Sequence, residues 1–408
     1  PPAVRRSSTW TSWRSSTSTG SVAEPDVRQR NAAALLRSLR TAGPASRAEL
    51  AGRTGLAKAT VGAIVGDLEQ AGAVRAHEQV RSGDRGRPGL RLTLAGGRPV
   101  GIGFEANVEY VAVVVVDLSG AVRHRLTRAV PDVRTVERAL GALAEEAAAL
   151  LREEGQQAVG ATVAVPGLIA EDDRTIAWTP NLGITGTSLT GVVDAAFGWQ
   201  DRARVSNDAD CAALAELHHG AGRGCEHLLY LTGTVGIGAG LVDGGRLVRG
   251  ARGFAGEVGH LPIGEPDARC GCGRLGCWEA TIGLHAVLAK VGLDELETPE
   301  ATARAVADVA TRDPAVRAAL VAIGEDLGRG LAILTGVLDP AVIVLGGYFG
   351  PLADVMLAPA RTVLESTLAA PVQELPDLRP GELGTESAAL GAAERALAEV
   401  YDGRVEVG

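Results

Sequence analysis

Aromatic residues are scarce in this chain of 408 residues, because phenylalanine, tryptophan and tyrosine together make up only 3% of it. Hydrophobic residues still account for 46%, so we expect cores built from alanine, valine and leucine. No apolar run reaches the ~18 residues that a membrane-spanning helix requires, and we therefore expect no membrane span. A chain of this length is long enough for two or three domains.

Acidic and basic residues are distributed unevenly along the chain. The net charge of the whole sequence is −9. Residues 1–99 contain 16 Arg or Lys and 7 Asp or Glu, a net charge of +9, which leaves −18 for the remainder. A basic N-terminal part joined to an acidic body suggests a nucleic-acid-binding module on a body that does not itself bind DNA. Chance segregation of charge is the alternative.

Cysteine is also rare, but three of the five cysteines are clustered: Cys270, Cys272 and Cys277 fall within eight residues, and His260 precedes them by ten. Three thiolates and one imidazole form a complete tetrahedral ligand set for Zn²⁺. A closed set of four ligands leaves no position for water, so the predicted zinc is structural. Three core thiols in a glycine-rich loop are the alternative. In a chain of this size the pattern favours a metal site in a reducing cytosol over disulfides, and hence a cytoplasmic protein.

The residues around this cluster form a longer motif. G-E-x-G-H from Gly256 to His260 is followed by C-x-C-G-x-x-G-C-x-E from Cys270 to Glu279. This combination resembles the signature of the ROK family, the repressor, open-reading-frame and sugar-kinase group. The resemblance extends from about residue 99 to the end of the chain. It implies an α/β fold, an actin-like ATPase domain of two lobes in which the zinc loop braces a sugar site, and assembly into homodimers or homotetramers.

The N-terminal segments predict a helix-turn-helix. After a Ser/Thr-rich stretch, residues 1–24, which we expect to be a disordered tail, Asp26 is the expected N-cap of a first helix. Ser46 and Glu49 form a capping box that starts a short second helix. A third helix follows at about residues 57–71, with apolar residues at helical spacing.

A wing is predicted beyond these helices. Strands at residues 74–77 and 90–94 flank a loop rich in glycine and arginine, so residues 25–97 should form a winged helix-turn-helix, similar to the N-terminal domain of ROK repressors. The third helix is expected in the major groove of duplex DNA, with wing arginines on phosphates or in the minor groove. The expected DNA contacts are Lys58, Ala59, Thr60, Arg81, Arg85 and Arg87. A helix-turn-helix used for protein contacts is the alternative.

The remaining residues, 98–408, are expected to form the ROK domain. Its first lobe should comprise about residues 98–203 together with a last helix at 387–400 that returns to it, and its second lobe about residues 204–386. The resemblance implies that a sugar binds between the lobes at Asn181, Asn207, Asp208, Glu257, His260 and Glu279. An ordinary turn asparagine and an aspartate that caps a helix are the alternatives for the first three of these residues.

The first hairpin of the ROK domain departs from the kinase pattern. Where sugar kinases of the family carry D-x-G-G-T for ATP phosphates, this chain reads Gly103-Phe104-Glu105-Ala106-Asn107. We therefore predict a sugar-responsive transcriptional regulator, a repressor by analogy, that is not an enzyme and holds zinc as its only cofactor. The rival is an ATP-dependent sugar kinase with an accessory DNA-binding domain, in which Asp208 is the catalytic base. A scaffold that binds a phosphotransfer protein is a third possibility on which the sequence is silent.

Overall fold

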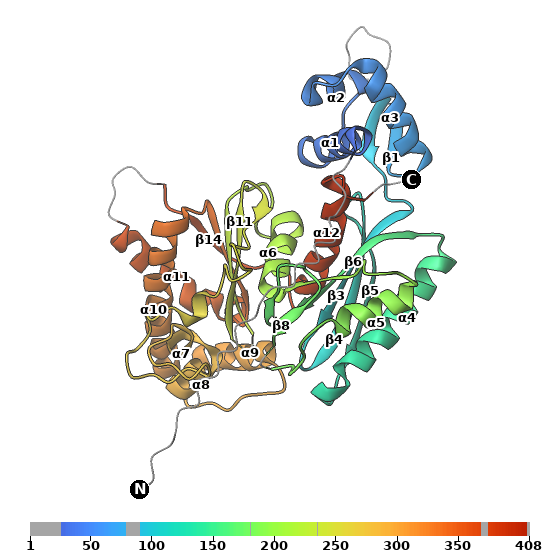
Figure 1. The fold of residues 1–408 in the computed structure, drawn as a ribbon. Coiled ribbons are helices and arrows are strands. Elements are labelled where there is room, and N and C mark those ends of the chain that lie inside the picture. The colour runs from blue at the N-terminus through green and yellow to red at the C-terminus, as the bar shows by residue number, and fades with distance from the viewer. Residues whose placement is uncertain (1–25, 79–89, 180, 235, 369–373, 406–408) are drawn as a thin grey trace.

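The computed structural model describes residues 26–78, 90–179, 181–234, 236–368 and 374–405. A small helical unit lies above two larger lobes that stand side by side, each built on its own β-sheet (Figure 1). Among the described residues, no helix is both long and apolar enough to cross a membrane. The predicted tail, residues 1–24, and the wing residues Arg81, Arg85 and Arg87 lie outside the described residues.

The small unit, residues 26–97, is called the winged-helix unit below. Its elements are α1 (Val27–Ala42), α2 (Arg47–Thr54), α3 (Lys58–Gln70), β1 (Val74–Glu78) and β2 (Leu90–Leu94). The predicted helix starts are confirmed, because the Asp26 side chain accepts from the Gln29 N–H and Ser46 forms its capping box with Glu49. Ala57 precedes α3 and gives it no side-chain cap. β1 and β2 pair antiparallel.

The first lobe is built on a five-stranded sheet in the order β5-β4-β3-β6-β9. Its strands are β3 (Pro99–Ala106), β4 (Tyr110–Asp117), β5 (Val122–Ala129), β6 (Gln157–Val165) and β9 (Arg204–Asn207). Short elements and covering helices complete it: η1 (Val133–Thr135), α4 (Val136–Glu153), β7 (Leu168–Ile169), β8 (Ile176–Trp178) and α5 (Ser188–Phe197). Because β9 pairs in parallel with β6, the first sheet continues to Asn207 instead of ending near residue 203 as expected.

The second lobe has a five-stranded sheet in the order β12-β11-β10-β13-β14. Its strands are β10 (Leu228–Gly233), β11 (Ile237–Asp243), β12 (Arg246–Leu247), β13 (Val342–Gly347) and β14 (Asp377–Pro380). Its other elements are η2 (Val258–His260), α7 (Glu279–Ile282), α8 (Leu284–Val291), α9 (Pro299–Ala310), α10 (Pro314–Leu338) and α11 (Phe349–Thr367). The central strands β10 and β13 pair in parallel and are fully buried except at the end of β13, as their apolar sequences predict.

Two helices lie between the sheets: α6 (Asp208–His219) packs on β10 and β11, and α12 (Ser387–Tyr401) packs on β3, β4 and β6. The predicted return of the last helix to the first lobe is therefore confirmed. The sequence predicts a helix from Cys211 to His219, but α6 begins three residues earlier, at Asp208. The Asn207 side chain accepts from the Ala209 and Asp210 N–H groups, and this cap allows the helix to begin at Asp208.

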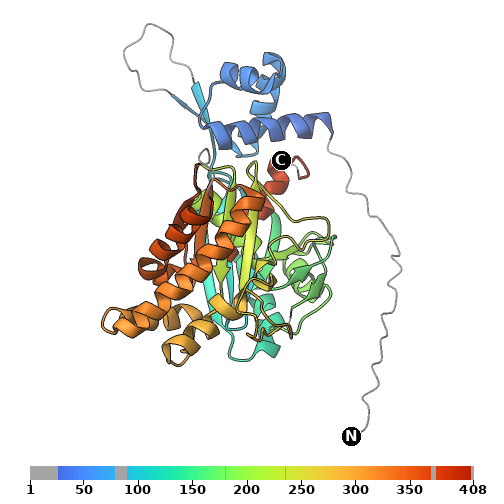
Figure 2. The same cartoon turned by 90° about the vertical axis from the view of Figure 1, so that its left-hand side faces the viewer.

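The winged-helix unit shares a hydrophobic core with the first lobe. Leu35 and Leu39 of α1 belong to the same cluster of buried side chains as Val114 of β4 and Leu397 and Val400 of α12. After rotation by 90°, Figure 2 shows the end of α12 directly beneath α1. The unit therefore rests on α12 over a continuous apolar contact instead of hanging from a linker.

Candidate functional site

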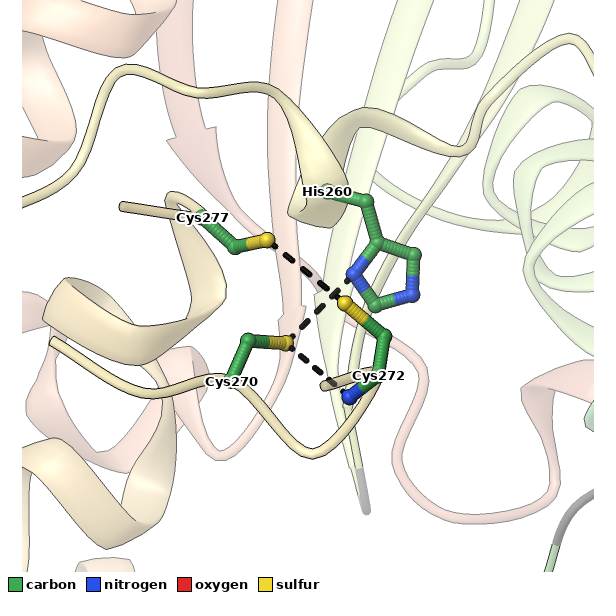
Figure 3. Close-up of side chains that lie close together, drawn as sticks. All are labelled: His260, Cys270, Cys272 and Cys277. Atoms are coloured by element: carbon green, nitrogen blue, oxygen red, sulfur yellow. Dashed lines mark hydrogen bonds between the residues drawn. The ribbon is translucent and has the colours of Figure 1, made fainter. Parts of the chain in front are cut away.

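The predicted zinc ligands converge in the second lobe (Figure 3). His260 ends η2, Cys270 and Cys272 lie in the following loop, and Cys277 stands two residues before α7. One potential ligand atom from each residue lies within 4.8 Å of all the others. Cys270 and Cys277 are buried, whereas Cys272 is exposed at the outer edge of the cluster.

The spacing of these atoms fits a tetrahedral zinc ion. The Cys272 and Cys277 sulfurs are 3.7 Å apart, and Cys270 Sγ is 3.6 Å from His260 Nδ1. Two sulfurs bound to one zinc at ~2.3 Å in a tetrahedron stand about 3.8 Å apart. A hydrogen bond from Arg274 is the main cause that lowers the pKa of the Cys272 thiol to about 6, which favours the thiolate needed for metal binding. The donor set and its geometry therefore suit Zn²⁺.

The loop that carries the predicted cysteine ligands, residues 261–278, is called the zinc loop below, and Glu279 joins it to β11. One Glu279 carboxylate oxygen, Oε1, lies 3.3 Å from Cys270 Sγ, and the other, Oε2, accepts from the Ile237 N–H at 2.9 Å. Ile237 begins β11, and the next strand residue, Gly238, packs against Ala209 in the first turn of α6. Glu279 is thus fixed at the junction between the zinc loop and the strand that supports α6.

Glycines of the G-E-x-G-H motif explain why this segment can lie against β11. Gly256 has a φ of 96°, and a Cβ at this position would stand 2.0 Å from the Ala239 carbonyl oxygen. A Cβ at Gly259 would stand 2.5 Å from the Ile237 carbonyl oxygen. Any larger residue would push the motif off the strand, so both glycines are required by close packing.

The N-terminus of α6 carries the predicted pair Asn207 and Asp208. The Asn207 side chain caps the helix and also donates to the Gly167 carbonyl at 3.1 Å. Asp208 Oδ1 also accepts from the Ala209 N–H at 2.9 Å, so Asp208 shares the capping role, which was the alternative considered for it. Burial raises the pKa of the Asp208 carboxyl to about 6. This carboxyl is held at the helix start with its pKa close to neutrality, as a group that binds hydroxyls or moves a proton requires.

Two further predicted sugar residues, Asn181 and Glu257, are exposed to solvent. Asn181 is exposed in a turn that Thr179 closes through two hydrogen bonds with Ile184. Thr179 packs against Gly167, whose carbonyl Asn207 binds, so the turn that carries Asn181 is anchored beside the start of α6. Glu257 is also exposed. The Glu257 carbonyl accepts from the His260 N–H at 3.4 Å, but no hydrogen bond among the described residues joins the side chain of Asn181 or Glu257 to another predicted sugar residue.

An ion-pair network between the lobes was not predicted. Asp173, in the loop between β7 and β8, pairs with Arg249 of the second lobe and, at 3.0 Å, with Arg395 of α12. Both arginines act electrostatically on the buried Asp210, whose pKa burial raises to about 7. Separations of 76 and 222 residues hide these pairs from any local pattern. The positive φ of Asp173, 55°, has no sequence signature either.

The hairpin that departs from the kinase pattern is closed by α12. A Cβ at Gly103 would stand 1.9 Å from the Ala389 carbonyl oxygen, so no side chain fits where a kinase carries aspartate. Glu105 lies two residues further along β3 and faces the same way. Its Oε1 accepts from the Tyr110 hydroxyl at 2.7 Å, whereas Oε2 has no hydrogen-bond partner among the described residues. Burial raises the pKa of Glu105 to about 7.

The glycines at the start of β11, Gly236, Gly238 and Gly240, form a second glycine-rich segment, and close packing explains them. Gly236 approaches Glu279, and a Cβ at Gly240 would stand 2.4 Å from the Ala213 side chain and 2.6 Å from the Ala209 carbonyl oxygen. These glycines admit α6 and Glu279 close to β11. Their presence is therefore no independent sign of a phosphate site.

The exposed face of α3 is flat and carries a positive charge at its start. Lys58 and Ala59 are exposed and Thr60 is partly exposed, whereas the opposite face of the helix is buried, as predicted. Gly62 and Gly66 have open space around the position of a Cβ, so packing within the protein does not require them.

A family model described as the ROK family matches residues 101–399. The chain belongs to the ROK family. The xylose repressor of Bacillus spizizenii is 26% identical, over 92% of this chain and 97% of its own length. The structure of a ROK transcriptional regulator, a homologue of the E. coli MLC protein, superposes with a TM-score of 0.78 at 22% identity, covering 92% of this chain and 97% of that one. The ROK hexokinase of Thermus thermophilus is 32% identical with a TM-score of 0.61, over 74% of this chain and 99% of its own.

Proposed function

We propose that this ROK protein is a sugar-responsive transcriptional regulator, a repressor by likeness to its relatives, which binds duplex DNA and does not phosphorylate its sugar. The observation that carries this proposal is the closed first hairpin. Backbone donors to the β- and γ-phosphates are what a kinase must supply. Here Gly103 and Glu105 face α12, which leaves no open glycine turn at that position.

DNA binding is assigned to the winged-helix unit. The N-terminus of α3 has no side-chain cap, so its first N–H groups are available to a DNA phosphate beside Lys58. Ala59 and Thr60 would then approach base edges in the major groove. The wing arginines Arg85 and Arg87, with Arg81, are proposed to add phosphate or minor-groove contacts. A dimer of such units would read two half-sites ~34–36 Å apart, or a multiple of that distance.

The sugar is proposed to bind between the lobes, where Asp208 and Glu279 are held by α6 and by the zinc loop. Asn181, Asn207, Glu257 and His260 are the further proposed contacts. A carboxylate accepts two hydroxyl hydrogen bonds, and an asparagine amide both donates and accepts. If His260 binds zinc through Nδ1, its Nε2 remains as a second polar atom for a sugar hydroxyl.

One structural Zn²⁺ per chain is proposed at His260, Cys270, Cys272 and Cys277. It would supply no chemistry to a reaction, because the four ligands complete its coordination. Its role would be to keep the loop folded against Glu279. A cytoplasmic location is proposed because reduced thiols are needed for this site.

The kinase alternative is favoured by the likeness to the Thermus hexokinase and by the retained Asp208. A coupled ADP-release assay with Mg²⁺ and a panel of monosaccharides, amino sugars and their phosphates separates the two functions. We expect thermal-shift stabilisation by at least one sugar without turnover, and an Asp208→Asn variant that loses that stabilisation. Sugar-dependent turnover in the ordinary kinase range of ~1–100 s⁻¹, abolished by Asp208→Asn, would make the protein an enzyme.

A further inference from the structure

The two helices between the lobes meet at one close contact. A Cβ at Gly391 of α12 would stand only 1.6 Å from the Cys211 carbonyl oxygen of α6, so the helix backbones touch there. Because α6 packs on the second sheet and α12 on the first, this contact lies where the lobes join. It is therefore a natural pivot for movement of one lobe against the other.

The pivot divides α6 unequally. Asp208, at the proposed sugar site, is three residues from Cys211, whereas His219 at the far end is eight residues away. At 1.5 Å per residue these arms are about 4.5 and 12 Å long. A small rotation that brings Asp208 onto a sugar hydroxyl therefore moves His219 further, and in the opposite direction.

The long arm ends on a buried carboxylate. His219 Nε2 lies 2.6 Å from Glu394 Oε1, and the Glu394 side chain, only 1% exposed, also pairs with Arg40 of α1. Burial by itself raises the pKa of Glu394, but Arg40 and the His219 hydrogen bond outweigh it and lower the pKa to about 2. The Glu394 carboxylate on α12 thus contacts both α6 of the second lobe, through His219, and the winged-helix unit, through Arg40.

The winged-helix unit is held at the same place by further contacts. The Arg40 guanidinium lies 4.6 Å from the centre of the Tyr401 ring, and Arg37 donates to the Tyr401 carbonyl. The Tyr401 hydroxyl in turn donates to the Leu118 carbonyl at 3.0 Å. A cavity of about 350 Å³ borders Arg40, His219 and Glu394, so α1 has room to change its tilt when this cluster rearranges.

We propose that Glu394 couples sugar binding to the DNA-binding unit. Sugar binding would move His219 relative to Glu394, and the Arg40–Glu394 pair would pass that movement to α1. The proposal rests on the proposed function. A sugar that draws the two lobes together would change the separation of His219 and Glu394, and Arg40 would carry that change into α1 and the attached α3. A ligand shifts DNA affinity only through such a difference between two states.

The test uses the full chain and measures operator affinity with and without D-xylose, D-glucose and N-acetyl-D-glucosamine. The primary variant is His219→Leu, which removes the hydrogen bond from α6 to Glu394 and keeps both members of the Arg40–Glu394 pair. We expect its sugar affinity to stay within about threefold of wild type. Its operator affinities with and without sugar should differ by less than about twofold. Glu300→Gln, which removes one half of an exposed pair with Arg304 on α9, is the matched control and should leave that change intact.

Glu394→Gln gives a second test, with amide hydrogen exchange of residues 27–42 as its readout. The sugar-dependent change in exchange of α1 seen in wild type should vanish in this variant. A wild-type-sized operator response in His219→Leu would overturn the proposed coupling through Glu394 and leave the proposed function standing. If the operator affinity of the wild-type protein responds to no sugar of the panel, both the proposed function and the coupling through Glu394 are refuted.

Discussion

Glu105 offers a quantitative test of how the phosphate hairpin is closed. It is 4% exposed, and burial raises its pKa from 4.5 to about 7. The unfolded chain therefore ionises first as the pH rises, and the folded protein loses stability between about pH 4.5 and 7 because it must bury the charge. At 1.36 kcal/mol per pKa unit, the cost above pH 7 is on the order of 3 kcal/mol.

The perturbation is Glu105→Gln, which removes the charge and keeps an oxygen for the Tyr110 hydroxyl. At pH 8 the variant should be more stable than wild type by up to about 3 kcal/mol, a rise in melting temperature of roughly 5 °C for a protein of this size. At pH 5 the two proteins should nearly coincide. Asp210 titrates in both proteins, so its contribution largely cancels in the difference, whereas the Asp208 charge helps to raise the Glu105 pKa and is part of the measured effect.

Thermal denaturation followed by fluorescence between pH 5 and 8 provides the assay. Glu300→Gln serves again as the control, because its exposed pair with Arg304 should give a small difference without this pH dependence. Glu105→Gln that is no more stable than wild type at pH 8, or equally stabilised at pH 5 and 8, would refute the buried charge. The hairpin would then have to be open to solvent.

Three further predictions address zinc and DNA. Cys272→Ser should reduce bound zinc, measured by elemental mass spectrometry, from one per chain to near zero; retention of stoichiometric metal would exclude this ligand set. Gly66→Ala should stabilise the protein by about 1 kcal/mol in denaturant titration, because its Cβ meets nothing, and yet weaken operator binding if α3 enters the groove. Gly52→Ala, equally open but on α2, is its control, and equal DNA affinity in both variants would contradict the assignment of α3. Replacing Arg85 and Arg87 with alanine should weaken binding to specific and nonspecific DNA and flatten its salt dependence in gel-shift titrations; an unchanged salt slope would exclude phosphate contacts.

Much of the local structure could be predicted because its signals are short-range. The Asp26 and Ser46 caps fix the helix starts through side-chain bonds to N–H groups three residues away. The proposed zinc ligands lie close together in sequence, so their spacing was enough to predict that the four side chains meet. Prediction failed by three residues at α6, because the residue that caps the helix is Asn207, whose side chain accepts from the Ala209 and Asp210 N–H groups.

The family motif and the departure of the hairpin from the kinase pattern could therefore be identified from the sequence alone, since each depends on residues only a few positions apart. The environment of those residues was decided only by the tertiary structure. Glu105 has a neutral-range pKa because α12, almost 300 residues later, covers it. Glu394 is 175 residues from His219 and 354 residues from Arg40. The three side chains meet only because α6 and α12 pack against each other between the two sheets, beneath α1. Short-range interactions determine where the helices begin and which residues form the Cys/His cluster. The packing of elements far apart in the sequence determines the pKa values of buried carboxylates and brings His219, Glu394 and Arg40 into contact.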